Sequence, residues 1–342
     1  MISGWDIGGA HLKVARCDDQ GNNFQIIQIP CPLWQGIESL EQAIETILAK
    51  LDSQHDLTAI TMTGELVDIF ADRQSGVAEI LNCVARYIKT ENIKVYGAQA
   101  GWLNIEQATQ QWQMVASRNW QASASIAAAH QQDGLFIDIG STTCDIIALI
   151  NGKESPRGFN DLERQTSREL LYTGAIRTPL ISLCQSAPFD GELVGLAAEV
   201  FATTGDCWVL LDKLNPKSIQ DSSANNKPWN AQYCASRIAH LLGTDAVQTQ
   251  LQPWQQLAQW FAEQQCHLII NAILHVISSH KTLPANAPII GAGVGRFIIK
   301  MCAQRLGRPY QDLDVLIAIP HTEASDHAAA VAVALLARQQ LT

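Results

Sequence analysis

The chain has 342 residues, of which 47% are hydrophobic and 16% charged, and its formal net charge is −10. This composition excludes a disordered chain, and the lack of Lys/Arg runs argues against a nucleic-acid surface. With no apolar stretch long enough to span a bilayer and no basic leader before the first strand, we expect a cytoplasmic protein without a membrane partner.

Hydrophobic periodicity in the first part of the chain predicts strands that alternate with helices. Strands are expected at 1–6, 12–18, 23–29, 57–63 and 94–96, and helices at 37–51, 75–89 and 119–130. This alternation is typical of an α/β lobe.

The second part opens in the same way. Strands are expected at 134–139, 145–151 and 313–319 (the last one ended by Pro320), helices at 192–202, 231–241, 254–279 and 326–339, and a surface loop at 214–230. We therefore predict two lobes, residues 1–132 and 133–342, with a C-terminal helix able to pack back on the first lobe.

The most informative motif is a turn that occurs twice. Asp6 and Asp138 each end an apolar strand and are followed, two residues later, by Gly8 and Gly140. Glycine lets the backbone approach a ligand, the N–H groups of such a turn cradle an anion, and the Asp can hold a divalent metal ion. A tight hairpin would explain the glycines but not the carboxylates. Two copies predict two lobes that close on one polyphosphate, with Mg²⁺ or a similar divalent ion held by both Asp residues.

Other side chains beside these turns suit phosphate binding. Ser141 and Thr142 can donate hydrogen bonds to phosphate oxygens, and Asp145 brackets the second turn. Lys13 can reach a phosphate, although a solvated strand lysine explains it equally well. The remaining candidates of the two turns are Gly9 and Thr143.

A third glycine turn contains Gly291, Gly293 and Gly295 between an expected strand and a helix. Alone it is a weak match to a dinucleotide-binding turn. As a third loop around the same ligand it would be more meaningful.

Several charged residues near glycine or threonine segments have two interpretations. Glu65 and Asp68 can be a base and a metal ligand, or surface carboxylates at a helix start. Arg177 can be an anion clamp or a solvated loop arginine. Glu199 and Asp206, which flank a Thr-Thr-Gly segment, can belong to the site or form a helix-end pair.

Two such turns with a late Gly-x-Gly-x-Gly resemble the superfamily of sugar kinases, heat-shock ATPases and actin, whose two ribonuclease-H-like lobes close on a phosphate chain. Within it, several strings are similar to the hydantoinase/oxoprolinase-related branch, and in particular to a narrower family linked to tetrahydromethanopterin-dependent one-carbon metabolism. These strings lie at 62–68, 117–120, 138–143, 172–179, 201–206 and 235–245. The resemblance covers nearly the whole chain.

The resemblance implies a transferase of methanofuran-type cofactor biosynthesis. It would couple an (aminomethyl)furan diphosphate to the phenol oxygen of a tyramine- or tyrosine-type acceptor and release pyrophosphate. The cradle would hold the diphosphate, Asp6 and Asp138 would hold the metal, and Glu65, then Asp206, are the candidate bases.

Other functions stay open. The first alternative is a small-molecule kinase or ATPase with a nucleotide in the cleft, since all three glycine turns are compatible with ATP. An idle nucleotide-binding subunit and a ring-opening hydrolase rank lower. The sequence leaves the oligomeric state open, and a homodimer is the one assembly considered.

Overall fold

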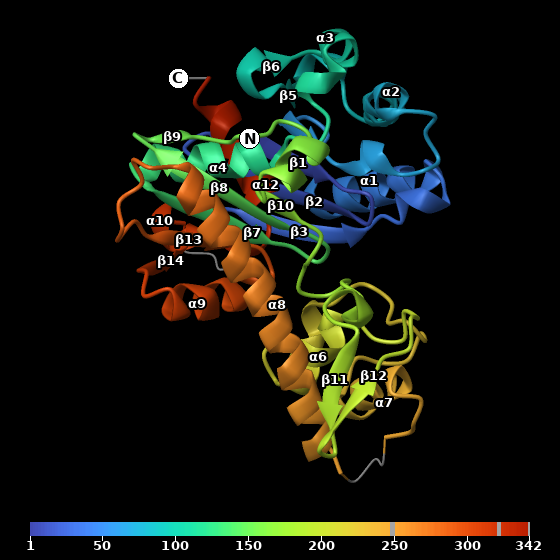
Figure 1. Ribbon diagram of the computed structural model, residues 1–342. Helices are drawn as coiled ribbons and strands as arrows, with labels where there is room; N and C mark the ends of the chain where they lie inside the picture. Colours follow the sequence, from blue (N-terminus) through green and yellow to red (C-terminus); the bar gives the residue numbers. More distant parts are fainter. Residues whose placement is uncertain (247–249, 320–322, 341–342) are drawn as a thin grey trace. The chain divides into compact units, whose positions relative to one another are not determined.

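The computed structural model describes residues 1–246, 250–319 and 323–340 (Figure 1). The chain forms two compact units. Unit 1 comprises Met1–Gly134, Leu149–Ser155 and Gln311–Thr342, and unit 2 comprises Leu135–Ala148 and Pro156–Tyr310. The sequence predicted two lobes with a single boundary at 132/133. Each compact unit instead combines more than one segment of the chain, and the C-terminal segment belongs to unit 1.

Unit 1 is built on a six-stranded sheet of order β3-β2-β1-β4-β5-β6. The strands are β1 (Ile2–Ile7), β2 (His11–Cys17), β3 (Gln25–Pro30), β4 (Leu57–Met62), β5 (Ile93–Tyr96) and β6 (Trp102–Leu103). β1 pairs antiparallel with β2 and parallel with β4, which in turn is parallel to β5. An antiparallel hairpin edge joined to parallel strands is the ribonuclease-H-like arrangement expected from the sequence.

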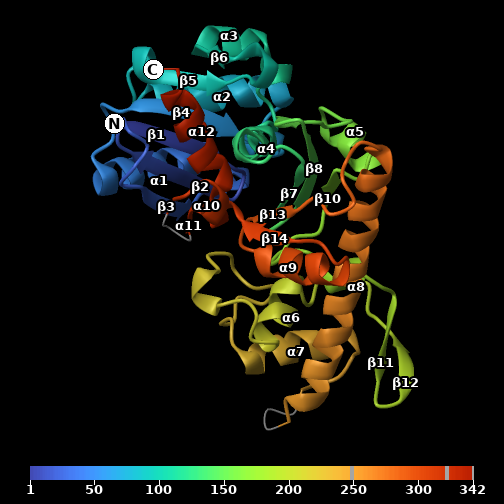
Figure 2. The same ribbon diagram turned by 90° about the vertical axis from the view of Figure 1, so that its left-hand side faces the viewer.

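Helices cover both faces of this sheet. They are α1 (Glu38–Leu51), α2 (Arg73–Ala85), α3 (Ile105–Gln110), α4 (Asn119–His130), α10 (Leu313–Leu316), α11 (Glu323–Asp326) and α12 (Ala328–Arg338). Trp5 and Ile7 belong to the core that includes α1 and α2. Gly4 lies against α12, which crosses β1 beside α4 (Figure 2). Because side chains alternate along a strand, Asp6 is on the Gly4 face.

Unit 2 repeats the strand order around its own sheet, β10-β8-β7-β13-β14, with β9 paired to β8. The strands are β7 (Gly134–Ile139), β8 (Cys144–Ile150), β10 (Leu170–Leu171), β13 (Ile289–Ala292) and β14 (Tyr310–Asp312). β9 (Lys153–Glu154) pairs with Leu149 and Ile150 at the end of β8, and these residues belong to the unit 1 segment Leu149–Ser155. As β1 does with β4, β7 runs parallel to β13. Each half of the sequence opens with a pair of strands, and the two pairs occupy the same position in their sheets.

Five α-helices and a separate hairpin also belong to the described part of unit 2. They are α5 (Asp161–Thr166), α6 (Thr204–Leu210), α7 (Ala231–Leu241), α8 (Gln252–Ser279), α9 (Arg296–Arg305) and the β11 (Ser186–Phe189)–β12 (Glu192–Gly195) hairpin. α8 contacts α6, α7, α9 and β11, so one long helix ties these elements together (Figure 1). Among the described residues, no helix combines the length and apolar character needed to cross a bilayer.

Most predicted elements are confirmed, but two are wrong. The predicted helix at 192–202 is instead strand β12 followed by a loop, because Asp190 and Gly191, at φ of 50° and 82°, form a hairpin turn. The predicted strand at 313–319 begins with helix α10, and Ala318 has a φ of 57° that no strand allows. Pro320, which was expected to end that strand, lies outside the described residues.

Candidate functional site

The two glycine-carboxylate turns have the same backbone geometry. The N–H of Gly8 donates to the carbonyl of His11 at 3.0 Å, and the N–H of Gly140 donates to the carbonyl of Thr143, also at 3.0 Å. The repeat in the sequence is therefore a repeat of structure, and it places one turn at the end of β1 and one at the end of β7.

Each turn leaves backbone donors for a ligand. In the second turn, the N–H groups of Ser141, Thr142 and Thr143 donate to no protein oxygen of residues 1–246, 250–319 and 323–340. In the first turn, the same holds for Gly9 and Ala10 within the described chain. Such groups need water or a ligand as acceptor, and a row of them favours an anion. The Ser141 and Thr142 hydroxyls, 3.5 Å apart, add two more donors.

The second turn is held in place by the segment that follows β10. The N–H groups of Ala175, Ile176 and Arg177 donate to the carbonyls of Gly140 and Ser141 at 2.9–3.1 Å. Arg177 is thereby fixed next to Ser141 with its side chain exposed, which suits the predicted anion clamp. Sequence reasoning missed how closely Gly174 approaches Ser141, although the string 172–179 had singled out this segment.

Two of the three late glycines lie against the second turn. Gly293, at φ 81°, approaches the Asp138 carboxylate so closely that a Cβ atom would overlap it. The N–H of Gly295 donates to the carbonyl of Ile139 at 2.8 Å. Gly291 instead lies against the ring of Tyr310, so the structure does not bring it to the turn.

In unit 1, the Asp6 carboxylate is nearly buried and has two polar neighbours. Lys13 Nζ lies 3.5 Å from one oxygen, and Asn119 Nδ2 lies 3.5 Å from the other. Asn119 opens α4, and its own side chain accepts from the N–H of Trp120. Asn119 was not predicted as a site residue, but it lies in the 117–120 string that carries the family resemblance.

Glu65 is 1% exposed and lies in a short 3₁₀ helix at Gly64–Leu66 directly after β4. Its carboxylate accepts a hydrogen bond from Ser117 Oγ at 2.8 Å. Ser117 has a φ of 55°, a conformation that costs free energy in a non-glycine residue and often occurs at functional sites. Thr63, just before this helix, donates its N–H to the carbonyl of Ile7, which ties the Glu65 segment to the first turn. Asp68 is exposed.

Asp206 has the environment of a structural group. It is fully buried and pairs with the buried Arg237 Nε at 2.7 Å, while its second oxygen accepts from the N–H of Thr203. Burial raises the pKa of Asp206, and Arg237 opposes that rise. With both oxygens occupied, the carboxylate favours a structural role over that of a base.

The other two predicted carboxylates of unit 2 are Asp145 and Glu199. Asp145 pairs with the buried Arg164 at 2.8 Å, and its pKa is raised by burial despite this partner. Glu199 is exposed in the loop before α6. Neither has contacts that point to a ligand.

The donors in each unit fit a metal ion that is held partly by substrate. No group of three or more His, Cys, Asp or Glu side chains able to hold a metal occurs within the described ranges. Mg²⁺ usually needs only one or two protein carboxylates, because substrate phosphates and water complete its shell. Asp6 and Asp138, each beside a turn with unused N–H groups, match that requirement.

Comparisons with known proteins give relatives in sequence and in structure. The family model described as hydantoinase/oxoprolinase matches residues 56–340. A (4-{4-[2-(γ-L-glutamylamino)ethyl]phenoxymethyl}furan-2-yl)methanamine synthase from Methanocaldococcus jannaschii is 31% identical over 246 residues, 72% of each chain. A synthase of the same name from Methanococcus vannielii is 36% identical over 114 residues, 33% of this chain and 51% of that one. The match to a nucleotide-free acetone carboxylase structure covers 98% of this chain and 70% of that one. Its TM-score of 0.60 at 11% sequence identity shows a shared fold.

Proposed function

Because this chain belongs to the hydantoinase/oxoprolinase family, and a furan-methanamine synthase matches most of its length, we propose that it is an ether-forming transferase. It would couple an (aminomethyl)furan diphosphate to the phenol oxygen of a tyramine- or tyrosine-type acceptor and release pyrophosphate. This step belongs to methanofuran-type cofactor biosynthesis, which serves tetrahydromethanopterin-linked one-carbon metabolism. The observation that carries the proposal is the 31% identity over 72% of both chains.

The reaction breaks the bond between the exocyclic carbon of the furan and a diphosphate oxygen. That carbon then forms a bond to the phenol oxygen, and the phenol proton passes to a base. The furan oxygen stabilises positive charge on the carbon, so departure of pyrophosphate can run ahead of attack. Negative charge therefore builds on the leaving oxygens, and groups aimed at them lower the barrier.

The unused N–H groups at 141–143 and the two hydroxyls beside them supply such groups in unit 2. Arg177, fixed next to Ser141, adds a positive charge. Lys13 has the corresponding role in unit 1. Mg²⁺ or a similar divalent ion would supply further charge neutralisation for the diphosphate, and Asp6 and Asp138 are the candidate ligands in their respective units.

The acceptor has to lose its phenol proton. An ordinary phenol has a pKa of about 10, so at neutral pH a base is needed. We assign this role to Glu65. Ser117 is slightly more exposed than Glu65 and is hydrogen-bonded to it, so its hydroxyl can orient the carboxylate or pass the proton to it.

The nine cysteines are free thiols, which supports a reducing, cytoplasmic location. The partners on this proposal are two small molecules, a diphosphate and a phenol.

Mass spectrometry of two parallel incubations tests the function. One contains the protein, Mg²⁺, (aminomethyl)furan diphosphate and either γ-glutamyl-tyramine or tyrosine; the other contains ATP and the furan alcohol. We expect the coupled ether and pyrophosphate in the first. ADP from the second, with no ether in the first, would show that the turns hold a nucleotide and that the chain is a kinase or ATPase.

A further inference from the structure

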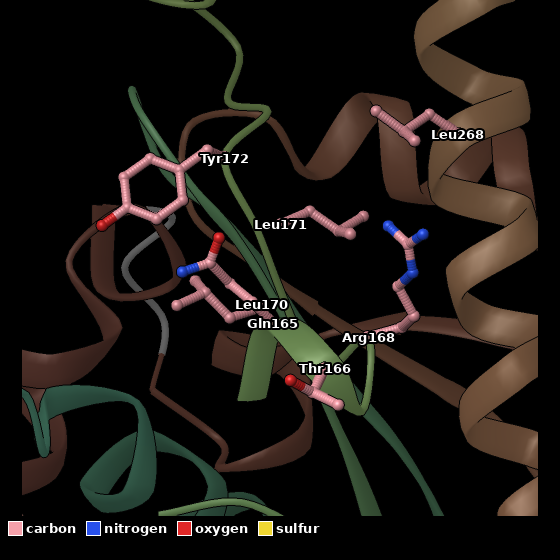
Figure 3. Close-up of a pocket in the computed structure, with 7 residues that line it drawn as sticks. All are labelled: Gln165, Thr166, Arg168, Leu170, Leu171, Tyr172 and Leu268. Atoms are coloured by element: carbon pink, nitrogen blue, oxygen red, sulfur yellow. The ribbon is translucent and has the colours of Figure 1, made fainter. Parts of the chain in front are cut away.

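A pocket of about 450 Å³ lies on strand β10 of unit 2, outside the groups assigned above (Figure 3). Its lining combines apolar side chains with an amide, a hydroxyl, a phenol and a guanidinium. The lining residues are Gln165, Thr166, Arg168, Leu170, Leu171, Tyr172 and Leu268. Such a mixture suits an elongated ligand with an apolar middle and a charged end.

One end of the pocket adjoins the second glycine turn. Leu171 pairs with Cys144, the residue directly after Thr143 of that turn. Tyr172 follows Leu171, and Gly174 comes two residues later, packed against Ser141. A ligand that lies along β10 with its end beyond Tyr172 therefore approaches the predicted diphosphate cradle.

The other end of the pocket is formed by Arg168. This residue follows α5 with a φ of 60°, a helix-ending position at which glycine or asparagine is usual. Its side chain is exposed, and among the described residues it pairs with no carboxylate. Figure 3 shows its guanidinium directed towards α8, on the side of the pocket where Leu268 lies. An arginine at a glycine-type position, facing a pocket without a protein partner for its charge, points to a ligand carboxylate.

On the basis of the proposed function, we propose that this pocket binds the acceptor and that Arg168 pairs with the carboxylate at the acceptor's far end. Leu171 and Leu268, which lie on the same side of β10 as Arg168 in Figure 3, would hold its apolar middle. An extended γ-glutamyl-tyramine measures roughly 15 Å from phenol oxygen to α-carboxylate on standard bond lengths, whereas tyrosine is about half as long. Only the γ-glutamyl-extended phenol carries a carboxylate that far from its phenol oxygen, so the assignment predicts that the pocket prefers it.

Isothermal titration with Mg²⁺ and pyrophosphate present tests the assignment without requiring turnover. We expect the wild type to bind γ-glutamyl-tyramine at least about tenfold more tightly than tyramine, since a charge-assisted contact to arginine is worth about that much. Arg168→Gly should abolish the preference while keeping the backbone conformation that glycine favours. Lys281→Ala, which removes an exposed cation elsewhere in unit 2, should retain it.

Equal affinities in the wild type, or a preference that survives Arg168→Gly, would overturn the assignment. In the coupled assay, Arg168→Gly should raise KM for γ-glutamyl-tyramine about tenfold and leave KM for tyramine unchanged. The two proposals fail differently. If the wild type forms no ether with any phenol, the transferase function is wrong; if it forms the ether and Arg168→Gly behaves as the wild type, only the pocket assignment is wrong.

Discussion

Gly174 lies so close to Ser141 that a Cβ atom at position 174 would overlap the Ser141 carbonyl group. Gln265, a fully buried residue of α8, donates to the Gly174 carbonyl at 2.8 Å and holds this contact from behind. The predicted diphosphate cradle therefore depends on the lack of a side chain at position 174, because a Cβ atom there must push the turn away.

We expect Gly174→Ala to lower ether formation about 100-fold, since a shift of about 1 Å in a positioning group can have that effect. The free energy of unfolding should fall by about 1–3 kcal/mol, as in overpacked cores. Gly195→Ala is the matched control, because a Cβ there meets open space. Equal activity of the two variants would show that the turn does not need this contact.

Asp138→Asn should lower kcat by about 10²–10³-fold, because the charge that would hold the metal ion is lost. Asp6→Asn should have an effect of the same order. In both variants the Mg²⁺ concentration needed for half-maximal rate should rise, and thermal unfolding should change little. Glu192→Gln, which neutralises an exposed hairpin carboxylate, is the control. A normal Mg²⁺ dependence in both Asp variants would rule out these ligands.

The pH dependence of the rate tests Glu65. If Glu65 takes the phenol proton, Glu65→Gln should lower kcat at neutral pH by about 10²–10⁴-fold. The remaining rate should rise as the pH approaches about 10, where the phenol ionises by itself. Ser117→Ala should lower the rate less and keep the wild-type pH profile. A loss in Glu65→Gln that is equal at all pH values would instead indicate a structural role.

The buried pair of Arg237 and Asp206 should control stability. Arg237→Ala leaves a buried carboxylate without its cation, and we expect a loss of about 3–5 kcal/mol in urea unfolding. Burial already raises the pKa of Asp206, and loss of Arg237 removes an opposing influence. The lone carboxylate would therefore take up a proton as pH falls, so the loss relative to wild type should shrink in acid. The double variant Arg237→Ala/Asp206→Asn should recover part of the loss; no recovery would contradict this account.

The buried thiols predict alkaline destabilisation. Burial raises the pKa of Cys17 from 9.0 to about 11 and that of Cys31 to about 12. Above pH 9 the unfolded chain loses these protons while the folded chain keeps them. The contribution of the thiols to stability is therefore fully present below pH 9 and is lost as pH rises towards 11. Urea unfolding between pH 8 and pH 11 measures this. Cys31→Ala should show a smaller alkaline loss than wild type, and an identical loss would show that this thiol does not contribute.

The two glycine-carboxylate turns could be predicted from the sequence because their geometry is local. The hydrogen bond from Gly8 to His11 spans three residues, and so does the bond from Gly140 to Thr143. The same holds for most strands and helices, whose periodicity reflects the faces that they bury. The Asp190-Gly191 turn is equally local, and the positive φ angles at these two residues explain why the helix predicted at 192–202 is wrong.

By itself, the sequence determined most of the strands, the two glycine-carboxylate turns and the family, since each depends on residues that are close together in the sequence. Only the tertiary structure decided that Ser117 donates a hydrogen bond to Glu65, 52 positions away in the sequence. The same is true of the buried pair of Arg237 and Asp206 and of the position of Arg168 at a pocket. These relationships depend on how distant segments pack. Packing is set by the summed burial and hydrogen bonding of the whole fold, which no local pattern records.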